Sequence, residues 1–278
     1  MAMKVTEHRR IDSPTNPLVK RLAALKESRA RERSGEFLIE GSREATRALL
    51  AGVDALRLVY SPDLATGRPA SEALLATAEA SGLEIVELSS PSFDRLSLRQ
   101  NPDGVALHAA RPDRGLAVLG DLSDGLILVI DGVEKPGNVG AMLRTADAVG
   151  AAAVIVSGHG TDMENPNVIR ASQGSVFALP LAVADTKAAS EFLKSRGFTL
   201  VATTPSATMP HWSADLSGPV AVLVGAEDSG LSQAWLNAAD TLVKIVMRAS
   251  AADSLNVSVA TAVVLYEAFR QRYVATAT

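Results

Sequence analysis

From residue 126 onward, short apolar runs alternate with segments that have the periodicity of amphipathic helices. The runs cover 126–133, 152–158, 198–204, 220–226 and 243–247, and the helical patterns cover 139–149, 186–197 and 255–272. An unbroken apolar run is typical of a strand buried on both faces, as in a parallel sheet. The alternation therefore predicts an α/β fold, a parallel sheet with helices on both faces.

The residues before this region are organised differently. Residues 1–35 hold nine Lys or Arg against four acids, although the whole chain has a net charge of −4. We predict a basic arm over 1–35, a smaller α/β domain over 36–112, a linker over 113–125 and the parallel-sheet domain over 126–278. A local positive charge is expected on a segment that docks on phosphates, although a solvated helix face fits the charge equally well.

Composition excludes several classes of site. The 278 residues include no cysteine, which removes thiolate metal sites and cysteine nucleophiles. The four histidines are scattered without ligand spacing, so we predict no metal site. No apolar stretch of about 18 residues occurs and the start lacks a signal-peptide core, so we expect a soluble, cytoplasmic protein without membrane partners.

Three loops after predicted strands combine glycine with polar side chains, and ligands of open α/β sheets bind at such strand ends. They are DGVEKPGNVGAMLRTADAVG (131–150), VAVLVGAEDSGLS (220–232) and VKIVMRASAADSLNVSVATAV (243–263). Each loop alone fits an ordinary helix cap or turn. The dinucleotide motif G-x-G-x-x-G is absent from the first loop, which disfavours a nicotinamide-dependent oxidoreductase.

Together and in this order, PGNVGAMLRTADAVGA, LVGAEDSGLS and SLNVSVATAVVLYEAFRQR resemble the three signature motifs of the TrmH/SpoU family of RNA ribose 2′-O-methyltransferases, in the SPOUT superfamily. The resemblance covers about residues 126–272, and residues 29–52 are similar to the substrate-binding domain of many members. It implies a C-terminal trefoil knot, although chains generally avoid knots. It also implies S-adenosylmethionine as methyl donor, a homodimer, and structured RNA as substrate, ribosomal RNA ahead of tRNA.

The resemblance carries site residues over by position. The polar positions of the family's active site correspond to Asn138, Arg144, Glu227, Ser254 and Asn256. Its cofactor-contacting positions correspond to Thr203, Gly225, Ile245, Met247 and Leu255. We expect RNA contacts from Arg29, Arg31, Arg33 and Arg144. One departure is Val246, where the family usually has proline; valine restores an N–H and leaves φ free.

The family implies that Arg144 activates the 2′-hydroxyl. A guanidinium has a pKa above about 12 and rarely releases its proton. We therefore predict that Arg144 binds a neighbouring phosphate and polarises the hydroxyl. The alternatives to a ribosomal RNA methyltransferase are a tRNA 2′-O-methyltransferase and a non-catalytic RNA-binding protein that retains the fold.

Overall fold

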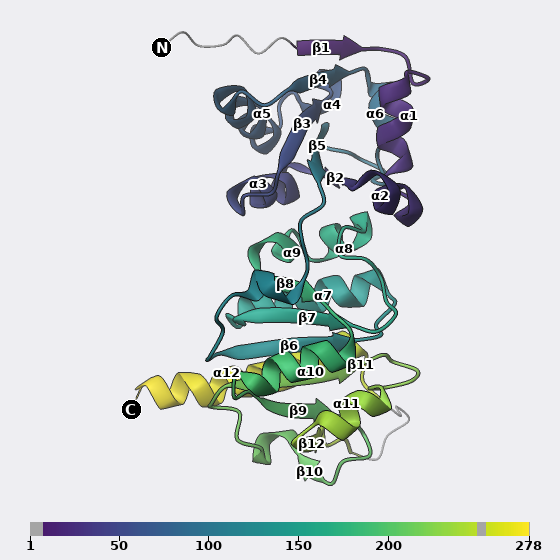
Figure 1. Ribbon diagram of the computed structural model, residues 1–278. Coiled ribbons are helices and arrows are strands. Elements are labelled where there is room, and N and C mark those ends of the chain that lie inside the picture. The colour runs from purple at the N-terminus through teal and green to yellow at the C-terminus, as the bar shows by residue number, and fades with distance from the viewer. Residues whose placement is uncertain (1–7, 249–253, 278) are drawn as a thin grey trace. The chain divides into compact units, whose positions relative to one another are not determined.

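The computed structural model describes residues 8–248 and 254–277 (Figure 1). The described chain forms two compact units. The first contains the residues up to Pro112 together with 162–178, and the second contains 113–161 and the residues from 179 onward. Among the described helices, none is long and apolar enough to cross a membrane.

Seven strands form the sheet of the second unit, and every pairing is parallel. Their order is β10–β12–β9–β11–β6–β7–β8. The strands are β6 (Leu126–Asp131), β7 (Ala153–Ser157), β8 (Leu181–Val183), β9 (Thr199–Thr203), β10 (Met209–Pro210), β11 (Val220–Gly225) and β12 (Thr241–Lys244). The predicted parallel sheet is confirmed. Strands β8 and β10 were not predicted, because three and two residues are too few to show a period.

Helices cover both faces of this sheet, as predicted (Figure 1). They are α7 (Pro136–Ala148), α10 (Thr186–Ser195), α11 (Gln233–Ala238) and α12 (Val257–Ala277). Ile127 and Val129 lie in the core beneath α10 and α11. Because side chains alternate along a strand, the buried Leu128 and Ile130 point to the opposite face, where α7 packs against α12. The trefoil knot stays a prediction, since residues 249–253 between β12 and α12 lie outside the described part.

The first unit has a mixed five-stranded sheet in the order β1–β4–β3–β5–β2, with parallel β1–β4 and β3–β4 pairs. The strands are β1 (His8–Ile11), β2 (Glu36–Glu40), β3 (Ala55–Tyr60), β4 (Ile85–Leu88) and β5 (Val105–Ala110). The helices are α1 (Pro17–Ala24), α2 (Ser28–Ser34), α3 (Ser42–Leu50), α4 (Pro62–Ala65), α5 (Pro69–Ser81), α6 (Ser90–Asp94), α8 (Pro166–Ala171) and α9 (Ser175–Ala178). This is the smaller α/β domain expected before the parallel sheet.

The structure differs from the prediction of a separate basic arm over residues 1–35. Strand β1 pairs with β4, and Val19, Leu22 and Leu25 of the α1 region are buried in the core of the first unit. The apolar spacing of this segment indicated a helix, but its apolar face packs inside the unit. The described part of the arm is therefore integral to the first unit.

The predicted linker over 113–125 is likewise packed. It contains the 3₁₀ helix η1 (Leu116–Leu119), and Leu119 is buried in the core of the second unit. The backbone of Arg114 accepts a hydrogen bond from the N–H of Val183, which ties the segment to β8. Glycine and aspartate suggested a flexible connection, but the three leucines in this stretch pack against the sheet domain.

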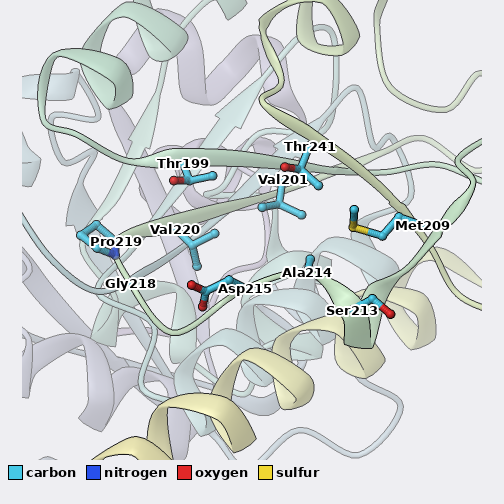
Figure 2. Close-up of a pocket in the computed structure, with 10 residues that line it drawn as sticks. All are labelled: Thr199, Val201, Met209, Ser213, Ala214, Asp215, Gly218, Pro219, Val220 and Thr241. Atoms are coloured by element: carbon cyan, nitrogen blue, oxygen red, sulfur yellow. The ribbon is translucent and has the colours of Figure 1, made fainter.

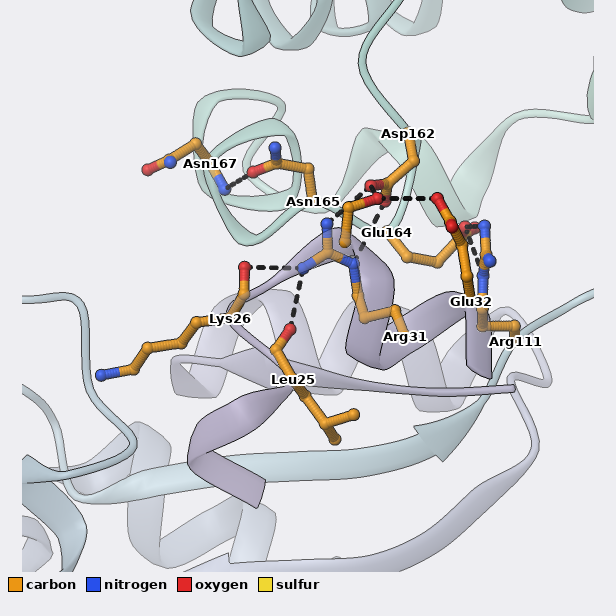
Figure 3. A network of polar contacts seen from close by, with 10 residues as sticks. Leu25, Lys26, Arg31, Glu32, Arg111, Asp162, Glu164, Asn165 and Asn167 are labelled. Carbon is orange, nitrogen blue, oxygen red and sulfur yellow. Dashed lines mark hydrogen bonds and ion pairs between the residues drawn. The ribbon is translucent and has the colours of Figure 1, made fainter. Parts of the chain in front are cut away.

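Residues 162–178 join the first unit through buried ion pairs (Figure 3). Arg31 is only 1% exposed; its Nη2 donates to Oδ2 of Asp162 at 2.6 Å, and its Nη1 donates to the carbonyls of Leu25 and Lys26. Arg111 pairs with the buried Glu164 at 2.8 Å. Arg31 is therefore unavailable to RNA, which corrects the sequence prediction; Arg29 and Arg33 remain exposed.

Replacing Arg31 by alanine is expected to lower the free energy of unfolding by about 3 kcal/mol, because the partly buried Asp162 loses its partner. Arg33→Ala on the same helix is the matched control, with an expected change within about 0.5 kcal/mol. Denaturant unfolding of both variants measures the difference. Equal stabilities of the two variants would contradict the structural role of Arg31.

Candidate active site

A pocket of about 380 Å³ opens at the carboxyl ends of β9, β11 and β12. This is the edge at which ligands bind in open α/β sheets. All five residues that the sequence analysis assigned to a cofactor line it: Thr203, Gly225, Ile245, Met247 and Leu255. Ser254 and Glu227 also line the pocket, so residues from three separate loops share one cavity.

The loop after β11 forms one wall of this pocket. A Cβ atom at Gly225 would overlap the backbone of Gly230 and Leu231, so only glycine lets the loop fold back over the strand end. Ala226 and Gly230 form an isolated antiparallel bridge, in which the N–H of Gly230 donates to the carbonyl of Ala226 at 2.9 Å. This tight turn holds Glu227 at the rim of the cavity.

Three predicted catalytic residues meet at that rim. The Nδ2 of Asn256 donates to Oε1 of Glu227 at 2.6 Å and to Oδ1 of Asn138 at 3.2 Å. The Oδ1 of Asn256 accepts the N–H of Ser258 at 3.0 Å and so caps the start of α12. Asn138, in contrast, lies in the first turn of α7 and does not cap it, because α7 begins after Lys135. The cluster is thus built from the starts of two helices and the turn after β11.

Lys135 also belongs to this cluster, although the sequence analysis did not select it. Its Nζ pairs with Oε2 of Glu227. This hydrogen bond from Lys135 is the main reason why the pKa of Glu227 is lowered, and the same contact raises the pKa of Lys135. Both groups are therefore charged at neutral pH. Glu227 is suited to orient Asn256 and is a weak proton acceptor.

Arg144 and Ser254 are not part of the hydrogen-bonded cluster. Arg144 is exposed on α7, about 120° around the helix and about 9 Å along it from Asn138. Neither Arg144 nor Ser254 has a hydrogen bond or ion pair with another residue that the structure describes. One chain therefore brings together Asn138, Glu227 and Asn256 and leaves Arg144 outside.

Two further hollows border the sheet domain. One of about 220 Å³ adjoins the first pocket: it is lined by residues of the loop after β6, by Asn138, and by residues 226–229, which both hollows share. The polar cluster lies between them. The other, of about 280 Å³, lies at the amino ends of β9, β11 and β12 and contains none of the predicted site residues (Figure 2). In the described residues no group of three or more His, Asp or Glu could hold a metal.

Comparison with known proteins agrees with this geometry. Residues 125–266 match the family described as SpoU rRNA Methylase, and residues 16–107 match an MRM3-like substrate binding domain. The chain belongs to the SpoU rRNA methylase family.

Among its relatives, the 23S rRNA (uridine(2479)-2′-O)-methyltransferase of Streptomyces viridochromogenes is 32% identical over 95% of this chain and 93% of its own length. The 23S rRNA (guanosine-2′-O-)-methyltransferase RlmB of Pseudomonas putida is 45% identical over 54% of this chain, and the match spans only 60% of that protein.

Solved structures give the same result for the fold. A crystal structure of an RNA 2′-O ribose methyltransferase is 44% identical, with a TM-score of 0.82 over 95% of this chain and 99% of that one. An AdoMet-bound rRNA methyltransferase from Sinorhizobium meliloti is 32% identical, with a TM-score of 0.84 over 94% of this chain and 97% of that one.

Proposed function

We propose that the chain transfers a methyl group from S-adenosylmethionine to a ribose 2′-hydroxyl of ribosomal RNA. The observation that supports this best is that three loops meet at the edge of the sheet where its strands end. There, the pocket lined by Thr203, Gly225 and Leu255 borders the cluster of Asn138, Glu227 and Asn256. The 44% identical RNA 2′-O ribose methyltransferase and the AdoMet-bound rRNA methyltransferase add support.

The pocket has the chemical character that an adenosyl group requires. Ile245, Met247 and Leu255 provide apolar walls. The Oγ1 of Thr203 is buried without a hydrogen-bond partner among the described residues, so a ligand in the pocket can supply one. Such a mixture of apolar walls and a few polar groups is typical of small-molecule sites. When bound, S-adenosylmethionine supplies the electrophilic methyl group.

The residues of the chain then position the acceptor. In this proposal the adjoining hollow beside Asn138 receives the ribose, and the amides of Asn138 and Asn256 hold it by hydrogen bonds. The ionised Glu227 fixes the orientation of Asn256. Arg144 polarises the hydroxyl and contacts a phosphate, once a second copy or the bound RNA brings these groups together.

The proposal includes a homodimer, because α12 leaves an apolar face exposed. Val259, Tyr266, Phe269 and Tyr273 are all exposed, and their spacing places them on one side of the helix. The three aromatic rings contact one another in sequence. An exposed face of this kind fits association with a second copy of the chain.

Tyr266→Glu is therefore expected to convert the protein to a monomer, since a charge would have to be buried in the interface. Light scattering after size-exclusion chromatography measures the mass. Leu50→Glu is the control. Leu50 is an exposed leucine of α3 and is not part of α12, so this variant should remain dimeric. A dimer that persists in Tyr266→Glu would refute this use of α12.

RNA binding by the first unit is proposed to use Arg29 and Arg33, which lie four residues apart on α2 and are exposed. The double variant Arg29→Ala/Arg33→Ala should weaken RNA binding and reduce the slope of log K against log salt by about 1–2, as two phosphate contacts are lost. Filter binding over a salt series measures both. Arg10→Ala is the control, because Arg10 is already paired with Asp12 and Glu87; an equal effect there would contradict the assignment.

The reaction itself is tested with S-adenosylmethionine and purified RNAs. Calorimetry measures cofactor binding, and primer extension at low nucleotide concentration maps new ribose methyl groups on ribosomal RNA and tRNA. Stops on ribosomal RNA support the proposal, and stops on tRNA alone favour the tRNA alternative. Cofactor binding without methylation of either RNA favours the non-catalytic alternative. Ribosomal RNA as substrate would place the reaction in the cytoplasm.

A further inference from the structure

Asp131 is a buried carboxylate at the carboxyl end of β6, next to the candidate active site. It is 4% exposed and forms no ion pair with any residue that the structure describes. In the sheet register it lies between Gly225 of β11 and Ser157 of β7. A buried acid without a cation is costly unless its oxygens accept good hydrogen bonds.

Both oxygens of this carboxylate are occupied. The hydroxyl of Ser157 donates to Oδ1 at 2.8 Å, and the backbone N–H of Ser232 donates to Oδ2 at 2.8 Å. Ser157 in turn accepts a hydrogen bond from Nε1 of the fully buried Trp235 at 2.8 Å. The network therefore links β6 and β7 to the start of α11.

Asp131 contacts the chain at the start and at the end of the loop that follows β11. Residue 225, where the loop begins, is paired with Asp131 in the sheet, and residue 232, where it ends, is hydrogen-bonded to the Asp131 carboxylate. The same loop lines the 380 Å³ pocket and presents Glu227 to Asn256. The backbone of residue 131 thus pairs with the start of the loop, and the Asp131 carboxylate holds its end at Ser232.

We infer that Asp131 is a positioning residue: its carboxylate holds loop 226–232 so that the wall of the methyl-donor pocket and Glu227 keep their places. It touches neither pocket itself and acts through the loop. The inference rests on the proposed function where it is tested by cofactor binding and turnover, but the position of the loop can be measured without either.

The first test uses Asp131→Asn, which keeps the shape and removes an acceptor, in a Trp212→Phe background. Trp235 is then the only tryptophan of the chain, so its fluorescence reports on the network directly. We expect the Kd for S-adenosylmethionine to rise about 10-fold and kcat at saturating cofactor to fall about 10–100-fold, as expected for misplaced catalytic groups. The emission of Trp235 should shift. Unchanged Kd, kcat and emission would overturn the inference.

A control separates positioning from general destabilisation. Ile127→Val changes a side chain in the core beneath α10 and α11 that takes part in none of the network's hydrogen bonds. When the two variants are compared at equal free energy of unfolding, Ile127→Val should retain cofactor affinity and turnover. A loss of affinity and turnover equal to that of Asp131→Asn would overturn the inference. Ser157→Ala, which keeps the Ser232–Asp131 bond, should give a milder loss of about 3-fold in affinity, and it serves as the test should Asp131→Asn fail to fold. No loss in Ser157→Ala would then overturn the inference.

Amide hydrogen exchange tests the role of Asp131 without measuring methyl transfer. The amide of Ser232 should be protected in the parent protein and should exchange at least about 10-fold faster in Asp131→Asn, because its acceptor is weakened. Unchanged protection would overturn the inference. If Asp131→Asn shows this faster exchange but the parent protein binds no S-adenosylmethionine, the proposed function fails while the role of Asp131 in holding the loop stands.

Discussion

Arg144→Lys is expected to lower the rate of methyl transfer by about 10²–10³-fold while leaving affinity for S-adenosylmethionine unchanged. Lysine keeps the positive charge but loses the planar fork that can contact a phosphate and a hydroxyl together. Arg144 does not line the candidate cofactor pocket, so cofactor binding has no reason to change. Single-turnover methylation with saturating enzyme measures the chemical step, and calorimetry measures cofactor affinity.

RNA affinity should be largely retained in Arg144→Lys, since the charge remains. Arg196→Lys, at the end of α10 in the same unit, is the control with expected wild-type turnover. Near-normal turnover of Arg144→Lys would reject the two-point role. A loss of RNA binding in proportion to turnover would instead indicate that Arg144 only binds the substrate.

Gly225→Ala is expected to weaken S-adenosylmethionine binding by more than about 100-fold. The added Cβ overlaps the backbone of Gly230 and Leu231, so the loop that forms the pocket wall has to move. A displaced wall removes contacts along one side of the ligand and shifts Glu227. Calorimetry measures the affinity, and thermal unfolding shows whether the fold is retained.

Gly137→Ala is the matched control for that substitution. Gly137 lies in α7, where an added Cβ would meet no other atom within 4 Å, and its backbone has no positive φ. Alanine there should bind the cofactor normally and stabilise the helix by up to about 1 kcal/mol. If Gly225→Ala binds as tightly as Gly137→Ala, the close approach of loop 226–231 is unimportant for the pocket.

The site illustrates how far local sequence reaches. Glycine and amide residues after apolar runs indicated the strand ends at which ligands bind, and the resemblance assigned Gly225, Glu227 and Asn256 to them. Lys135 and Asp131 were missed, because a lysine before a proline and an acid at the end of a strand are common in many turns. Their contacts with Glu227 and Ser232 join residues 92 and 101 positions apart, which no local pattern reports.

In the basic N-terminal segment, the sequence instead predicted an RNA contact that the structure excludes. Charge counting treated Arg29, Arg31 and Arg33 alike, but the geometry of α2 exposes two of them and buries the third against Asp162. The partner lies 131 residues away, in a segment between β7 and β8 that belongs to the first unit. Alternating burial along one short helix cannot be derived without knowing what packs on it.

The sequence by itself determined the parallel sheet, because strands that are apolar on both faces are stable only when helices cover both sides. It also determined which loops carry polar chemistry. Only the tertiary structure decided the strand order, the burial of Arg31 and the bonding of Asp131, since these depend on contacts between residues far apart in the chain. Local propensity acts over a few residues, whereas the position of a buried charge is set by the distant groups that replace water around it.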